Sequence, residues 1–207
     1  FYMDLGMQTV ESDMGWPGGG SEVPEGIALA RGHLVTIATG SFKSKPRCLE
    51  FLAALIGVAG RNVDVASLTQ QIMHTALEAA SHIYDGPSSN TVLTEDKFPG
   101  AALPGVRTVA DWFAFHKGSQ ALSQYNGAAI WIRVSEWEST VFGLMPSSFA
   151  GDYGLGTLMH ELLHKQAVGG GFTHPQMEAA LKRIGMSSGD YPLGLNRINS
   201  QIGRICF

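Results

Sequence analysis

The chain has no apolar run that approaches the length of a membrane-spanning helix, and it has few charged residues. A helix needs about 20 consecutive apolar residues to cross a membrane, and no stretch comes near this length. Charged residues make up 15% of the 207 residues, the formal net charge is −4, and no basic block occurs. These features predict no membrane span and disfavour nucleic acid as a partner.

Cysteine is also scarce, since the chain has only Cys48 and Cys206. The two cysteines could pair and tie the C-terminal end to the helix predicted around Cys48, or they could remain two buried thiols. The sequence leaves both arrangements open. A zinc site closed by cysteines is not expected, because such sites usually take four protein ligands and these two residues lie far apart in the sequence.

The first 44 residues show no signal peptide. The chain starts at Phe1, and no charged segment followed by an apolar core comes after it. Turn-forming residues dominate 15–24, and residues 33–38 form a candidate strand. We interpret residues 1–44 as a loop-rich N-terminal extension or linker. The chain could then be a fragment of a larger protein, and its localisation stays unknown, with secretion as part of that larger protein as one reading.

Residues 45–207 have the composition of one folded domain. Hydrophobic residues make up 44% of the chain, enough for a sizeable core, and the 26 glycines predict loops between short elements. Several segments have apolar residues at helical spacing, and Ser67 and Thr157 are predicted to cap two of these helices. The predicted helices span 46–58, 67–84, 109–116, 157–164, 173–184 and 195–202, and the β-branched and aromatic segment 128–134 is the predicted strand. The expected fold class is therefore α+β.

The most informative motif is His160-Glu161-Leu162-Leu163-His164. On a helix, residues four apart lie on one face, about 5–6 Å apart at Cβ, so His160 and His164 can bind one metal ion. A catalytic zinc takes nitrogen ligands in a tetrahedron and keeps one position open for water. Glu161 does not share that face, and its carboxylate can reach the water and accept a proton. The pattern is typical of a hydrolytic zinc site, and an amphipathic helix with two ordinary histidines is the alternative.

Over residues 157–164 the chain resembles the zincin metallopeptidases. It departs from the metzincin pattern, because Ala167 and Gly170 stand where that pattern has Gly and His. It is more similar to SprT-like zincins, in which a third histidine follows a variable insert and opens another helix, although Pro175 stands where they usually have Gly. The subfamily therefore stays unassigned. The resemblance implies a zincin-like domain with a Zn²⁺ cofactor, and a strand beside the metal helix that pairs with an extended peptide, a role we give to 128–134.

Three residues after the motif are candidates for the third metal ligand: His174, Glu178 and Asp190. The run Gly169–Gly171 is predicted to end the metal helix and to let the chain turn back, because glycine adopts positive φ without penalty. Thr173 as a cap would place His174 at the first position of the next helix. We favour His174, while Glu178 lies one turn further on the same face and Asp190 needs a longer excursion.

The sequence thus predicts a zinc metallopeptidase in which His160, His164 and His174 hold the metal and Glu161 is the catalytic base. The expected partner is a peptide or protein substrate, and no oligomeric state is predicted. One alternative is a non-catalytic module with a structural metal or with no metal. The other is a cell-wall amide hydrolase or a toxin-like domain of a larger secreted bacterial protein.

Overall fold

A computed structural model of the chain describes residues 23–186 and 197–207, except 102, 139, 142–144 and 147. Its α-helices are α1 (Glu25–Ala38), α2 (Pro46–Ala59), α3 (Val65–Ala79), α4 (Val109–Phe115), α5 (Asp152–His164), α6 (His174–Arg183) and α7 (Arg197–Cys206). Short 3₁₀ helices span Ser41–Ser44, Val134–Glu136 and Ser148–Ala150. The strands are β1 (Ile83–Asp85), β2 (Ala121–Ser123), β3 (Ile130–Ile132), β4 (Thr140–Val141) and β5 (Met145–Pro146). The fold is therefore α+β, and none of the described helices is long and apolar enough to cross a membrane.

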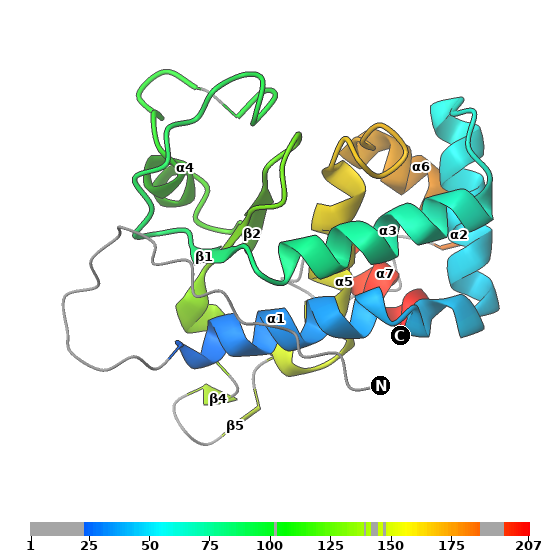
Figure 1. Cartoon of the computed structure of the whole chain (residues 1–207), viewed down its shortest axis with the longest axis horizontal. Helices are drawn as coiled ribbons and strands as arrows, with labels where there is room; N and C mark the ends of the chain where they lie inside the picture. Colours follow the sequence, from blue (N-terminus) through cyan, green and yellow to red (C-terminus); the bar gives the residue numbers. More distant parts are fainter. Residues whose placement is uncertain (1–22, 102, 139, 142–144, 147, 187–196) are drawn as a thin grey trace, which may run out of the picture.

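The helices build the larger part of the molecule around α5. Helices α1 and α3 run side by side, α2 packs against α6, and α7 lies along α5 (Figure 1). Buried side chains from all six of these helices and from the sheet form one core. Helix α5 is buried on nearly every side, which matches its run of apolar residues around the motif.

A small sheet and α4 form the other part of the molecule (Figure 1). The strand order is β1-β3-β2, with β1 parallel and β2 antiparallel to β3. Alternate residues of β3 face opposite sides, so Ile130 and Ile132 join the helical core. Trp131 points the other way into a second cluster with Phe98 and Phe113. Burial on both faces explains why the predicted strand has no polar alternation.

The candidate strand at residues 33–38 is wrong, because this segment lies within helix α1. Its β-branched residues favour a strand locally. However, Ala30, Leu34 and Ile37 are fully buried at helical spacing against α3 and α5, and this burial outweighs local propensity. Part of the predicted extension thus contributes to the core, and residues 1–22 lie outside the described residues.

The second predicted helix begins and ends earlier than expected. Asp64, not Ser67, caps α3, because the Asp64 carboxylate accepts a hydrogen bond from the Ser67 backbone N–H at 2.6 Å. The helix ends at Ala79, and residues 83–85 form β1 beside β3. Helical spacing continues through Ile83, but pairing with a strand nearly fifty residues later decides its conformation.

Other boundaries are confirmed. Pro46 starts α2, and Gly60 ends it in the left-handed conformation with φ of 61°. Helix α4 begins at Val109 as predicted, and α7 occupies most of the predicted 195–202 helix and continues to Cys206. Cys48 and Cys206 form a disulfide that joins α2 to α7, and both are fully buried.

Candidate metal centre

The metal-site helix α5 starts earlier than its sequence suggests. It begins at Asp152 after Gly151, so Thr157 is not its cap. The Thr157 hydroxyl instead donates to the Tyr153 carbonyl within the helix at 2.8 Å. Gly154 and Gly156 lie within this helix, and α7 packs closely against it: a Cβ on Gly156 would lie 2.2 Å from the Asn199 carbonyl oxygen. Glycine is required here for backbone packing of α5 on α7.

The end of α5 is formed by a sharp return of the chain. The helix ends at His164, five residues before the glycine run. Gly169, Gly170 and Gly171 have φ values of 60°, 80° and 77° and reverse the chain direction. The Phe172 N–H then donates to the Leu163 carbonyl at 2.8 Å. The predicted return is thus confirmed, although the glycines form the loop and do not end the helix.

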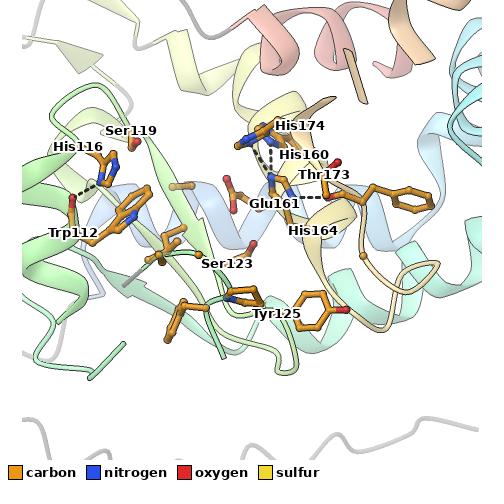
Figure 2. Close-up of a pocket in the computed structure, with 18 of the residues that line it drawn as sticks. Trp112, His116, Ser119, Ser123, Tyr125, His160, Glu161, His164, Thr173 and His174 are labelled. Carbon is orange, nitrogen blue, oxygen red and sulfur yellow. Dashed lines mark hydrogen bonds between the residues drawn. The ribbon is translucent and has the colours of Figure 1, made fainter. Parts of the chain in front are cut away.

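This return brings three histidines together. The Nε2 atoms of His160 and His164 are 2.8 Å apart, and those of His164 and His174 are 3.0 Å apart. His174 occupies the first position of α6, after Thr173, whose N–H donates to the Gln176 side chain at 2.9 Å. Among the described residues, these three histidines are the group that could hold a metal ion (Figure 2).

Hydrogen bonds set the protonation of two of these rings. His160 donates from Nδ1 to the side-chain oxygen of Asn199 on α7, and His164 donates from Nδ1 to the Phe172 carbonyl at 2.7 Å. Each neutral ring then has a bare Nε2 lone pair. Two lone pairs at this distance repel each other unless a cation lies between them. The arrangement therefore suits a metal ion bound by Nε2 atoms.

The local environment disfavours a proton as that cation. Burial lowers the pKa of His160 well below its ordinary value, and the neighbouring His164 and His174 lower this pKa further. Burial and then His164 lower the pKa of His174 to about 4, although His174 as a whole residue is exposed at the start of α6. Neutral imidazoles are the form that binds metal.

The two Nε2···Nε2 separations are somewhat shorter than those in a tetrahedral zinc site. Zn–N bonds of about 2.0–2.1 Å imply Nε2···Nε2 separations of roughly 3.3–3.4 Å in a tetrahedron. The two separations in the structure lie within about 0.6 Å of this range. Imidazole nitrogens also suit copper, iron and nickel, so the donor set does not by itself select zinc.

Glu161 lies beside the histidine group without belonging to it. Its side chain is buried, with 7% of the residue exposed, and it lines the same cleft as the three histidines. Figure 2 draws its carboxylate next to the histidines. Glu178, the second ligand candidate, is exposed on α6 and lies outside the described histidine group. Asp190, the third candidate, lies outside the described residues.

The cleft has a volume of about 790 Å³ and two unlike walls. The metal helix, the glycine loop and the start of α6 form one wall, and α4 and β2 form the other (Figure 2). The role given to 128–134 is corrected here, because β3 lies between β1 and β2 and has no free edge for a peptide. Strands β1 and β2 are the two edges of this sheet, and residues 121–123 of β2 line the cleft.

The buried side chain of Lys165 links the two walls of the cleft by hydrogen bonds. The Lys165 ammonium donates to the carbonyls of Gln124, Gly127 and Ala129 at 3.1, 2.7 and 2.9 Å. Burial lowers the pKa of Lys165 to about 7, opposed by the charges of Glu161 and Glu78. The three carbonyls favour the charged form, because an ammonium supplies three donors. The end of α5 is thereby fixed to the β2–β3 turn.

The sequence did not reveal Asn199, Lys165 or the α4 side chains as parts of the site. Asn199 and the α4 side chains lie far from the motif along the chain, and Lys165, which directly follows His164, belongs to no metal-site pattern. No family model, curated protein or solved structure matches this chain. The function is therefore argued from the chemistry of the site.

Proposed function

We propose that the chain is a zinc-dependent peptidase in which His160, His164 and His174 hold Zn²⁺. The observation that carries this proposal is the convergence of three Nε2 atoms beside a buried carboxylate at the wall of an open cleft. Three protein ligands leave one coordination position for water or substrate, as in catalytic zinc sites. The resemblance of residues 157–164 to zincins adds support.

In this proposal each residue has a defined task. When bound, zinc would act as a Lewis acid that polarises the scissile carbonyl and lowers the pKa of a water on the metal. Glu161 accepts a proton from the attacking water and donates it to the leaving amine. Asn199 and the Phe172 carbonyl keep His160 and His164 in the tautomer that presents Nε2.

The substrate would be an extended peptide segment. Strand β2 is an edge strand beside the cleft, and addition of a strand to a sheet edge is a common mode of peptide binding. The Lys165 hydrogen bonds hold this edge at a fixed place relative to α5. A peptide paired with β2 would thus lie along the metal site.

A structural metal is the competing function. Structural zinc sites are usually closed by four protein ligands, often cysteines. Here the group within the described residues has three histidines, and both cysteines form a disulfide. The open cleft next to the histidines favours catalysis over a structural role. A cell-wall amide hydrolase or toxin-like domain would use the same chemistry on another substrate.

The test is cleavage of a random peptide library, read by mass spectrometry. The zinc-loaded protein should cut internal peptide bonds, and the chelated protein should not. A protein that binds one zinc tightly but cuts no peptide would overturn the proposal and favour the structural metal. Purified cell-wall fragments serve as a parallel substrate, since cleavage of these alone would favour the amide hydrolase.

A further inference from the structure

The cleft wall opposite the histidines carries two stacked aromatic rings. Trp112 and His116 lie on and just after α4, with ring centroids 4.5 Å apart and planes inclined by 31°. Both side chains line the cleft that contains His160 and Glu161. In Figure 2 they lie across the cleft from the metal histidines. The two rings form a surface that faces the proposed reaction centre.

This aromatic pair is held in place by hydrogen bonds. His116 donates from Nδ1 to the Trp112 carbonyl at 3.1 Å. The Arg133 guanidinium donates to the carbonyls of His116 and Ser119 at 3.0 and 2.9 Å, and also to the Phe113 carbonyl. Arg133 follows the buried strand β3, so the end of α4 is anchored to the sheet. A preorganised surface binds a ligand with less loss of conformational entropy.

Apolar side chains surround Trp112, and polar Ser119 and Gln120 lie near His116. Phe98, Ala101 and Leu122 line the same part of the cleft as Trp112. Histidines aside, the charged side chains among the described lining residues are Glu161 and Arg61. Arg61 belongs to the other wall, where its guanidinium donates to the Gly170 and Gly171 carbonyls at 3.3 and 2.9 Å. The aromatic wall thus favours an uncharged group with a large apolar surface.

We infer that Trp112 and His116 form a subsite for an aromatic side chain of the peptide, close to the scissile bond. This inference rests on the proposed peptidase function and names its substrate preference. Aromatic rings pack favourably on one another in offset or tilted arrangements, and an aromatic residue also buries a large apolar area. A preference of roughly 10–100-fold in kcat/KM over alanine is expected from such a pocket.

The experiment compares peptides that differ at one position near the cleavage site, with Phe, Leu or Ala there. The zinc-loaded wild type should favour Phe at one position. Trp112→Leu keeps an apolar side chain but removes the ring, so it should abolish the preference of Phe over Leu while Leu peptides are still cut. Leu77→Ala is the control for loss of an exposed apolar side chain away from the cleft, because Leu77 lies on α3, is 60% exposed and is not among the lining residues.

The outcomes separate this inference from the function on which it rests. Cleavage by the wild type without preference for Phe would overturn the subsite, and so would a preference that Trp112→Leu retains. An equal loss in Trp112→Leu and Leu77→Ala would also overturn it, since the effect would then not come from the cleft. Failure of the zinc-loaded wild type to cut any peptide would refute the peptidase function itself.

Discussion

His160 on α5 donates its Nδ1 proton to the side-chain oxygen of Asn199, 39 residues further along the chain on α7. Asn199 is buried, with 2% of the residue exposed. The two helices pack closely enough for this contact because residue 203 is glycine. A Cβ on Gly203 would lie 2.2 Å from the Asp152 carbonyl oxygen. The disulfide between Cys48 and Cys206 further holds α7 in place. Asn199 therefore orients a metal ligand from a distant part of the chain.

Replacement of Asn199 should weaken zinc binding. Asn199→Ala removes the acceptor that orients His160, and loss of such a partner typically costs about 10–100-fold in metal affinity. Asn199→Asp keeps an acceptor oxygen and should bind zinc more tightly than the alanine variant. Competition with a chromophoric chelator measures these affinities.

Ser200→Ala provides the matched control on the same helix. The buried Ser200 hydroxyl has no hydrogen-bond partner within the described part of the chain. Its removal should leave zinc affinity unchanged. If Ser200→Ala and Asn199→Ala weaken binding equally, the effect comes from general loosening of α7 and not from the His160 hydrogen bond.

The third ligand can be identified by single alanine substitutions. His174→Ala should lose nearly all tight zinc binding, because the Nε2 of His174 lies 3.0 Å from that of His164. Glu178→Ala should bind zinc like the wild type, since Glu178 is exposed on α6. The reverse order of affinities would identify Glu178, and not His174, as the third ligand.

Glu161→Gln separates metal binding from catalysis. Glutamine keeps the shape of the side chain but cannot accept a proton, so peptide cleavage should fall by about 10²–10⁴-fold, the usual contribution of a general base. Zinc affinity should be unchanged, because Glu161 lies outside the histidine group. An undiminished rate in the zinc-loaded variant would remove Glu161 from the mechanism.

Local sequence signals predicted the parts of the site that neighbouring residues determine. The spacing of His160 and His164 fixes two ligands on one helix face. Thr173 and Gln176 form a capping box, which sets the start of α6 and therefore the position of His174. In each case the residues that carry the signal also make the contact, so the prediction does not depend on the rest of the fold.

Features that depend on distant contacts could not be predicted in this way. Residues 33–38 look like a strand, but the core makes them helical. Asn199 is one polar residue in an amphipathic helix, and its role follows from its contact with α5. Likewise, β3 has the composition of a peptide-binding strand, but only the order β1-β3-β2 reveals that β3 is the central strand and that β2, which lines the cleft, lies at an edge. Contacts between segments far apart in the sequence determine all three features.

The stability of the metal-free protein should fall at mildly acidic pH, partly because of His33. Burial lowers the pKa of His33, although its Nε2 hydrogen bond of 2.6 Å to the Phe149 carbonyl opposes this shift. Below about pH 6.5 the unfolded chain takes up this proton and the folded chain resists it, so the free energy of unfolding decreases. The decrease is complete once the pH passes the lowered pKa of the folded state.

His33→Gln tests this contribution because glutamine can keep a donor near the Phe149 carbonyl but does not titrate. Denaturant unfolding with chelator present, at about pH 7.5 and pH 5.5, gives the pH dependence of both proteins. The other histidines are the same in both and cancel in the comparison. The variant should lose less stability on acidification, and an equal loss would show that His33 does not contribute.

Removal of the metal should stop catalysis without unfolding the protein. A chelator should abolish peptide cleavage, and added zinc should restore it. The fold should persist because the core formed by the helices and the sheet consists of apolar side chains and includes none of the three histidines, and the buried disulfide joins α2 to α7. A small zinc finger, in contrast, unfolds when its metal is removed. Near-ultraviolet circular dichroism of the chelated protein measures tertiary packing directly. Cooperative loss of this signal on chelation, together with no cleavage under any condition, would make the metal structural.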